Sequence, residues 1–250
     1  MTLIAERVSM SFGGLSALND VTLTVPEHHI VGLIGPNGAG KTTLFNCLTG
    51  LYAPTSGRVL LNGRPLAADP AEAARRGIAR TFQNIRLFSE MSVIDNVLTG
   101  RHTRIRQSLL SALLHGPGYR RSEAEAVEWA RAELAFVGLD PEGRAPARSL
   151  AYGDQRRLEI ARALAGDPAV LMLDEPTAGM NAKETAAVRE LIIAIRERGI
   201  AVVVIEHDTK FIFSLCDHVH VLVRGQMLVE GPPAVVRADQ RVIEAYLGAA

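Results

Sequence analysis

The chain has 250 residues, enough for a large core in one α/β domain or in two lobes. Its 27 basic and 27 acidic residues cancel, so no global basic field exists and no nucleic-acid partner is expected. Its two cysteines lack metal-ligand spacing and exclude a disulfide framework, which indicates a reducing compartment. The sequence shows no signal peptide and no apolar run of about 18 residues. We therefore expect a cytoplasmic protein that reaches a membrane only through a partner.

The first part of the chain alternates between short strands and helices. Apolar patterning and turn signals predict strands at 3–5, 21–25, 30–34, 58–61 and 78–82, and helices at 42–48 and 71–76. Asn62-Gly63 is typical of a hairpin turn, and Gly77 is expected to end the second helix.

From about residue 86 to about residue 165, strand-like runs disappear. Residues 122–137 are strongly helical, with a Ser-x-x-Glu capping box at Ser122 and Glu125, after a break at 115–118. Another helix is expected at 154–165. We interpret 86–165 as a helical subdomain inserted into an α/β core.

The α/β core is expected to resume after the insertion. Its predicted elements are strands at 169–173, 200–205, 219–223 and 226–229 and a helix at 183–198. The predicted organisation is a single domain whose parts are the core (1–85 and 166–233), the helical subdomain (86–165) and an amphipathic tail (234–250).

Residues 35–42 read GPNGAGKT and fit the G-x-x-x-x-G-K-[ST] phosphate-binding pattern between a strand and a helix. Gly35, Gly38 and Gly40 let the backbone wrap an anion closely, because they lack a Cβ and reach positive φ easily. Lys41 is expected to reach the β- and γ-phosphates, and the Thr42 hydroxyl to bind Mg²⁺. The alternative is a glycine-rich turn before an ordinary helix.

Acidic and imidazole side chains follow two further buried strands. Asp174 suits Mg²⁺ binding through a water molecule, and Glu175 suits polarisation of an attacking water. His207 is placed to hydrogen-bond a γ-phosphate, although a lone histidine is more often structural. His218 and His220 share one strand face, but no third metal ligand is evident, so we interpret them as structural.

Residues 150–157 read LAYGDQRR and precede a helix with apolar positions at helical spacing. A helix N-terminus that contains glycine is a second candidate anion site. Taken alone, this segment is equally compatible with an ordinary helix cap.

In this order, the phosphate loop, the helical insertion, LAYGDQRR, LMLDEP (171–176) and the strand-end histidine resemble an ABC-transporter nucleotide-binding subunit over nearly the whole chain. The resemblance implies an α/β fold: a RecA-like P-loop NTPase core with an antiparallel β subdomain and an inserted helical subdomain. It implies an ATPase whose cofactors are ATP and Mg²⁺.

The resemblance also implies roles for individual residues. Catalysis is assigned to Glu175, His207 and Gln83, and Mg²⁺ binding to Thr42, Gln83 and Asp174. Adenine stacking is assigned to Phe12, for which a packed core phenylalanine is an equal alternative. The phosphate contacts implied in the same subunit are Gly35, Pro36, Asn37, Gly38, Ala39, Gly40, Lys41, Thr42 and Thr43. Those implied toward ATP on the facing subunit are Ala151, Tyr152, Gly153 and Asp154.

The signature and the D-loop depart from the usual family pattern. The signature is commonly LSGGQ, so Ala151 stands where a serine hydroxyl is usual, Tyr152 replaces a glycine and Asp154 takes the glutamine position. Asn181 stands where the D-loop often has aspartate. These differences concern contacts across a dimer.

The same segments resemble the ATP-binding subunits of branched-chain amino-acid importers, and urea and amide importers share the pattern. The segments are FGGL (12–15), FQNIRLF (82–88), VIEHD (204–208) and the tail VIEAYLG (242–248). The resemblance implies permease subunits as partners, a second ATP-binding subunit in a homo- or heterodimer, and indirectly a solute-binding protein. It places the chain at the cytoplasmic side of the inner membrane.

The permease contact is expected within 83–97, where Ile85, Leu87, Phe88 and Met91 offer apolar anchors; packing of the subdomain is the alternative. A P-loop GTPase or kinase is a rival, but the Asn-Lys-x-Asp guanine motif is absent. A non-transport regulatory ABC ATPase is a second rival, although such proteins usually have two cassettes, coiled-coil arms or a basic face.

Overall fold

The computed structural model describes residues 2–101 and 117–247. The chain forms two compact units, one of residues 1–80 and 169–250 and the other of residues 81–168. These boundaries lie a few residues from the subdomain limits expected at 85/86 and 165/166.

The first unit contains a mainly parallel sheet with strand order β10-β9-β3-β8-β7-β6. Among the described strands of this sheet, only the β9–β10 pair is antiparallel. The central strands β3, β7 and β8 are buried at every position, as expected for apolar strands covered on both faces. The strand bounds are β3 Ile30–Ile34, β6 Ile78–Arg80, β7 Val170–Asp174, β8 Ala201–Ile205, β9 His218–Val223 and β10 Gln226–Gly231.

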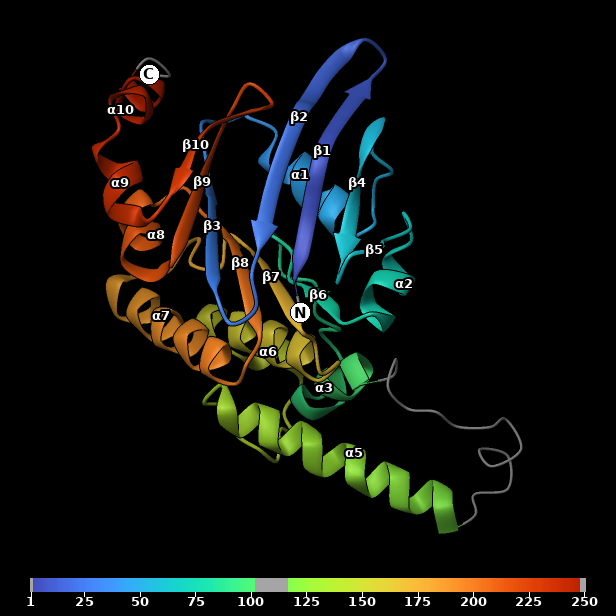
Figure 1. Ribbon diagram of the computed structural model, residues 1–250. Coiled ribbons are helices and arrows are strands. Elements are labelled where there is room, and N and C mark those ends of the chain that lie inside the picture. The colour runs from blue at the N-terminus through green and yellow to red at the C-terminus, as the bar shows by residue number, and fades with distance from the viewer. Residues whose placement is uncertain (1, 102–116, 248–250) are drawn as a thin grey trace. The chain divides into compact units, whose positions relative to one another are not determined.

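A second, antiparallel sheet in this unit has the order β2-β1-β4-β5. Its strands are β1 Leu3–Phe12, β2 Leu15–Val25, β4 Ser56–Leu61 and β5 Arg64–Pro65, so β1 and β2 are longer than the alternation predicted. Helix α1 (Lys41–Leu48) lies between the two sheets (Figure 1). Its Leu44, Phe45 and Leu48 are fully buried in a core cluster shared with strands of both sheets.

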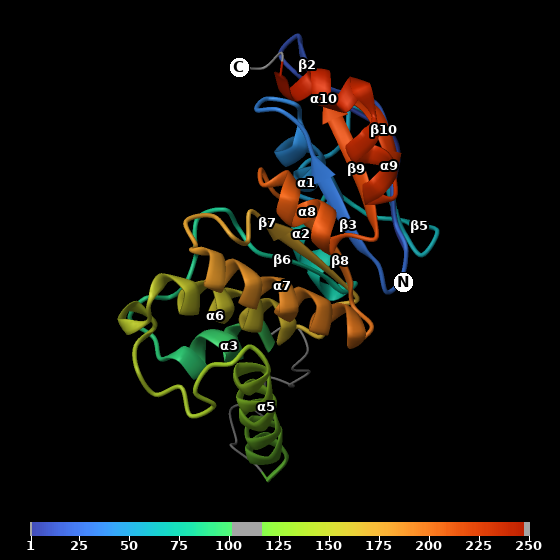
Figure 2. The ribbon, with the colours of Figure 1, turned by 90° about the vertical axis from the view of Figure 1, so that its left-hand side faces the viewer.

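Five other helices belong to the first unit within the part of the chain that the structure describes. They are α2 (Pro70–Arg75), α7 (Ala182–Glu197), α8 (Thr209–Leu215), α9 (Pro233–Ala238) and α10 (Gln240–Leu247). Helix α8 packs beside β3 and α9, and helices α9 and α10 lie alongside β10 (Figure 2). Asn181 begins α7 with a full capping box, because its side chain accepts from the Glu184 amide while the Glu184 side chain accepts from the Asn181 amide.

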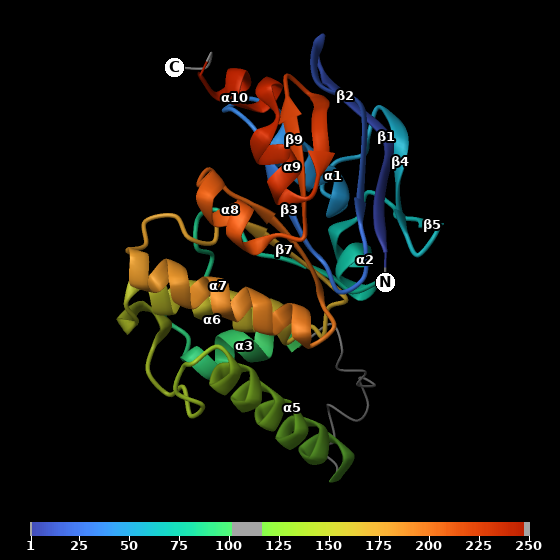
Figure 3. The ribbon, with the colours of Figure 1, turned by 60° about the vertical axis from the view of Figure 1, so that its left-hand side comes forward.

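The second unit is helical. Helices α3 (Val93–Arg101), α5 (Pro117–Phe136) and α6 (Tyr152–Leu164) pack on one another, with a short 3₁₀ turn at Ala147–Ser149 (Figure 3). The capping box predicted at Ser122 is wrong, because α5 already runs through that position from Pro117. The expected break at 115–118 is also wrong for Pro117 and Gly118, because both residues are helical. Proline is compatible with a first helical turn, where its missing N–H has no intrahelical partner. Residues 115 and 116 lie outside the described residues.

Across the described segments 2–101 and 117–247, none of the helices is both long enough and apolar enough to span a bilayer.

Candidate nucleotide-binding site

The candidate site forms where parallel strands of the first unit end. Strand β3 leads directly into the phosphate loop at Gly35, β7 ends at Asp174, and β8 is followed by Glu206 and His207. These strands run parallel as neighbours β3-β8-β7. The loops that follow them therefore gather at one edge of the sheet, which is where ligands of open α/β sheets bind.

The phosphate loop needs glycine at two of its positions for different reasons. A side chain on Gly35, at φ 154°, would overlap the carbonyl oxygen of Leu222 on the neighbouring strand. A Cβ on Gly38, at φ 75°, would meet no atom of the described residues within 4 Å, so only the left-handed backbone demands glycine there. The first glycine therefore serves packing against the sheet, whereas the second leaves open space beside the backbone.

Lys41 is the first residue of α1 and is almost fully buried. Its ammonium group donates to the carbonyl oxygens of Gly35 at 2.7 Å and Pro36 at 3.0 Å. Burial lowers the pKa of Lys41, and the negative charges of Glu175 and Asp174 oppose that shift. A cation held at a helix N-terminus beside a glycine loop matches the requirements of a phosphate group.

Glu175 and His207 are brought together from the ends of neighbouring strands. His207 Nε2 lies 3.0 Å from Glu175 Oε1. Glu175 has φ 48°, a left-handed backbone that is rare for a residue with a side chain. Its amide donates to the Ile205 carbonyl at 2.9 Å, which holds this conformation in place. A left-handed backbone at a residue with a side chain is strained, and such positions cluster at functional sites.

Glu206 is a part of this site that the sequence interpretation missed. It is buried, and its Oε1 accepts hydrogen bonds from the Thr177 amide at 2.8 Å and the Thr177 hydroxyl at 2.5 Å. This carboxylate therefore fixes the turn after Glu175. One feature of the sequence could have indicated Glu206, because an acidic residue that follows a buried strand must find hydrogen-bond donors.

Arg80, at the end of β6, is a second residue missed from the sequence. Its Nη2 donates to Asp174 at 3.3 Å, and its Nη1 donates to Asn46 at 2.8 Å and Thr49 at 3.2 Å. The guanidinium also lies over the Phe45 ring, 5.4 Å from its centroid. Arg80 thus ties Asp174 to the helix that begins at the phosphate loop.

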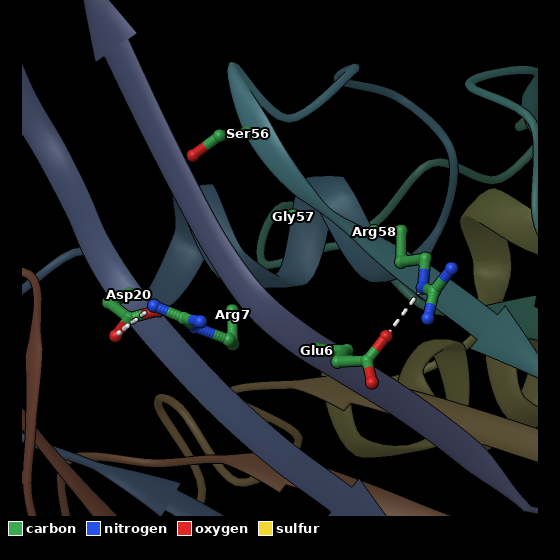
Figure 4. Close-up of a pocket in the computed structure, with 6 residues that line it drawn as sticks. All are labelled: Glu6, Arg7, Asp20, Ser56, Gly57 and Arg58. Atoms are coloured by element: carbon green, nitrogen blue, oxygen red, sulfur yellow. Dashed lines mark hydrogen bonds and ion pairs between the residues drawn. The ribbon is translucent and has the colours of Figure 1, made fainter.

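A hollow on the antiparallel sheet has a different character (Figure 4). It is lined by Glu6, Arg7, Asp20, Ser56, Gly57 and Arg58. Its charged groups pair with one another: Arg7 Nε lies 2.9 Å from Asp20, and Arg58 Nε lies 2.5 Å from Glu6. These pairs are largely exposed and therefore add little stability. The four charged side chains that line the hollow form two pairs, so these residues present no unpaired positive or negative charge to a ligand.

Replacing Arg80 by methionine is expected to lower the free energy of unfolding by about 1–3 kcal/mol, because Asp174, Asn46 and Thr49 each lose this donor in a buried setting. The matched control is Arg58→Met in the exposed pair, for which little or no loss is expected. Urea unfolding followed by circular dichroism measures both. Equal losses in the two variants would contradict a special role for Arg80.

Phe12 lies at the end of β1, where 43% of its surface is exposed. This exposure does not fit the packed-core alternative. The ring contacts Tyr52 edge to face, with centroids 5.5 Å apart and an interplanar angle of 74°. An exposed aromatic ring held by a second one presents a flat apolar face, which suits stacking on a base.

The remaining predicted residues belong to the second unit. Gln83 is exposed, and its carbonyl accepts a hydrogen bond from the buried Arg156. Ala151 is the N-cap of α6 and gives no side-chain cap, while the ring of Tyr152 is 47% exposed. The carboxylate of Asp154 pairs with Arg157 on the same helix. The helix therefore begins with backbone amides that no capping side chain of the N-cap residue covers, and the roles of these residues stay predictions.

Comparison with known proteins agrees with this geometry. Residues 18–178 match the family model described as ABC transporter, and residues 226–250 match the one described as branched-chain amino acid ATP-binding cassette transporter. The chain is 48% identical over 245 residues to the high-affinity branched-chain amino acid transport ATP-binding protein BraF of Pseudomonas aeruginosa, covering 97% of this chain and 96% of that protein.

Solved structures show the same fold. The ADP conformation of MJ1267, an ATP-binding cassette of an ABC transporter, aligns with a TM-score of 0.86 at 32% identity, covering 99% of each chain. A dimeric post-hydrolysis state of the ATP-binding cassette MJ0796, bound to ADP and Pi, aligns at 0.76 and 25% identity over 92% of this chain and 98% of that one. The expected P-loop fold and family resemblance are thereby confirmed. The chain belongs to the ABC transporter family, as one of its ATP-binding ATPase subunits.

Proposed function

We propose that this subunit hydrolyses ATP to energise the import of branched-chain amino acids. The observation that supports the solute class most directly is the match of residues 226–250 to the branched-chain cassette model, together with near full-length similarity to BraF. The matched segment comprises β10, α9 and α10, which lie outside the phosphate-binding loops. The similarity thus extends beyond the residues that any ATPase of this fold requires.

The residues at the sheet edge fit magnesium nucleotide. Residues 35–43 wrap the phosphates, with Lys41 on the β- and γ-phosphates. Oxygen donors are what Mg²⁺ prefers, and the Thr42 hydroxyl, the Asp174 carboxylate and the Gln83 amide oxygen would supply them. Mg²⁺ supplies neutralisation of phosphate charge when bound. Phe12 stacks on the adenine, with Tyr52 supporting its ring.

Glu175 is the residue that accepts a proton from the attacking water. Its partner His207, 3.0 Å away, holds the carboxylate and binds the γ-phosphate. Glu206 and Arg80 act as positioning residues, since the first fixes the Thr177 turn and the second holds Asp174. These hydrogen bonds limit the motion of the Asp174 and Glu175 carboxylates before the nucleotide binds. Less reorganisation of the site is then needed during the reaction.

Two such subunits enclose two ATP molecules in the proposed working state. The dimeric MJ0796 cassette supports this arrangement. Ala151, Tyr152, Gly153 and Asp154 at the start of α6 then face ATP on the other subunit. Ala151 stands where a serine is usual, and Asp154 is paired with Arg157. The contact with ATP on the other subunit therefore relies on backbone amides and the helix N-terminus.

We assign the permease contact to residues 83–97 of the second unit. Phe88 is 53% exposed and Met91 is 36% exposed, so both offer apolar surface. Buried Asn96 holds this segment: it accepts from the Phe88 amide at 2.9 Å and donates to the Phe88 carbonyl at 3.0 Å. A fixed apolar loop suits transmission of motion to membrane subunits. The proposed assembly puts the chain at the cytoplasmic face of the membrane, with a solute-binding protein as an indirect partner.

Transport is tested by deleting the gene for this chain and measuring uptake of radiolabelled leucine, isoleucine and valine. Loss of uptake that the intact gene restores, and the Glu175→Gln gene does not, is the expected result. Unchanged uptake of these amino acids, with loss of urea or amide uptake, would contradict the solute class while leaving the ATPase role intact.

Replacing Lys41 by alanine is expected to weaken ATP binding by about 10- to 100-fold, because a charge-assisted contact worth about 1.5–3 kcal/mol is lost. Equilibrium binding of a fluorescent ATP analogue measures this. Lys183→Ala, which removes an exposed lysine from α7, is the control and should bind normally. Equal affinity in both variants would show that the loop is an ordinary helix start.

A further inference from the structure

The strongest unassigned cluster lies at the opposite edge of the parallel sheet from the phosphate loop. His218 opens β9, which runs parallel to β3 with His218 beside Val31, whereas the phosphate loop follows the far end of β3. His220 is next on the same face of β9. Glu230 of β10 lies directly opposite His220 in the strand register. The structure therefore supplies the third ligand that the sequence did not reveal.

The ligand atoms of the three side chains converge. One atom from each of His218, His220 and Glu230 lies within 4.8 Å of the others. Glu230 Oε2 lies 2.8 Å from His220 Nδ1, and the two imidazole rings have centroids 4.9 Å apart. Ligand atoms around a tetrahedral Zn²⁺ are about 3–3.5 Å apart, given bonds of about 2.0–2.2 Å. Small rotations of the half-exposed Glu230 and of His218 reach that spacing.

His220 is 2% exposed, and its Nδ1 faces the Glu230 carboxylate at 2.8 Å. A neutral imidazole with an available lone pair is the form that binds a metal.

The surroundings leave room for a fourth ligand. A hollow beside the cluster is lined by Thr22, Thr24, Pro26, His29, Asp217, His218, His220 and Glu230. Asp217 already accepts from the Ile30 amide at 2.8 Å and from Arg196 at 3.3 Å, so it is committed to the sheet. A water molecule in the hollow can therefore complete the coordination.

From this geometry we propose that His218, His220 and Glu230 form a site for a single divalent transition-metal ion of the Zn²⁺ class. Two imidazoles and one carboxylate are a set that zinc accepts, and one carboxylate leaves the site with a single positive charge. The ion joins β9 to the edge strand β10. It therefore stabilises the hairpin from which the C-terminal helices α9 and α10 extend, remote from the ATP chemistry.

The test is a zinc titration of the full-length chain, stripped with chelator and kept free of nucleotide and magnesium. Calorimetry with competition from a chromophoric chelator measures stoichiometry and affinity. Because His220 is buried, the variants are Glu230→Gln and His218→Gln at the more exposed ligands, each expected to weaken zinc binding at least about tenfold. His28→Gln, which removes an exposed histidine outside the cluster, should bind zinc like the parent chain.

Cobalt gives a second readout. Co²⁺ bound to this set should show the intense visible absorption of a tetrahedral site in the parent chain and lose it in both variants. The proposal is overturned if the parent chain binds no zinc, or if Glu230→Gln and His218→Gln bind it with unchanged stoichiometry and affinity. Retained ATP binding in both variants would show that any loss belongs to this cluster and not to the nucleotide site.

Discussion

Replacing Glu175 by glutamine is expected to slow ATP turnover by about 10²–10⁴-fold while ATP still binds. Glutamine keeps the shape of the side chain and can still meet His207, which lies 3.0 Å from the carboxylate, but it cannot accept a proton from water. Phosphate release at saturating ATP measures turnover, and equilibrium binding of ATP measures affinity. The variant should also accumulate as a dimer with ATP, because hydrolysis no longer separates the subunits.

The matched control for this prediction is Glu190→Gln, at an exposed carboxylate of α7 whose side chain is 70% accessible. It should turn over ATP at the parent rate. A normal rate in Glu175→Gln would remove Glu175 from the role of base. Light scattering that finds only monomers of the slow variant at high concentration with ATP would contradict the dimer.

Replacing Arg156 by methionine is expected to destabilise the protein by about 3–5 kcal/mol, because it leaves the Glu159 carboxylate buried without its nearest cation. Both side chains are almost fully inaccessible, at 3% and 1%, and their charged groups are 3.3 Å apart. Burial already raises the pKa of Glu159, against the opposing charge of Arg156. The loss of stability is expected near the lower end of that range, because a second cation, Arg162, lies 3.9 Å from Glu159.

The Arg156 variant should also loosen the loop that contains Gln83. Arg156 donates to the Phe82 carbonyl at 2.7 Å and to the Gln83 carbonyl, while Glu159 accepts from the Phe82 and Arg86 amides, each at 3.4 Å. Helix α6 thus holds a segment without regular structure through its own buried charges. If the loop transmits motion to the permease, the variant should lose coupling of ATPase rate to transport.

Urea unfolding measures the stability loss, and protease cleavage within residues 82–91 measures loosening of the loop. Arg157→Met is the control on the next position of α6, since its pair with Asp154 is about one-third exposed and should contribute about 0–1 kcal/mol. The double variant Arg156→Met/Glu159→Gln should recover part of the loss, because it neutralises the buried carboxylate that lost its nearest cation. A double variant as unstable as the sum of both single changes would contradict this account.

Local sequence predicted most elements of the first unit. Strands β3, β7 and β8 are continuous apolar runs, and the glycine-rich loop after β3 has a fixed spacing. Short stretches of sequence are therefore enough to predict these strands and this loop. The start of α5 was predicted wrongly because the Ser122 capping box is also an acceptable helix interior. Pro117 is already helical, and proline is tolerated in a first helical turn because its missing N–H has no intrahelical partner there.

The phosphate loop, Asp174, Glu175 and His207 could be named in advance because each directly follows a recognisable buried strand. Their partners could not. Arg80 and Asp174 are 94 residues apart, Glu206 and Thr177 are 29 apart, and Glu230 meets His220 across a hairpin register. Short-range patterns report which backbone a segment prefers, but they contain no information about which strand becomes its neighbour. Strand order and register set those pairings, and with them the hydrogen bonds that hold the reacting groups in place.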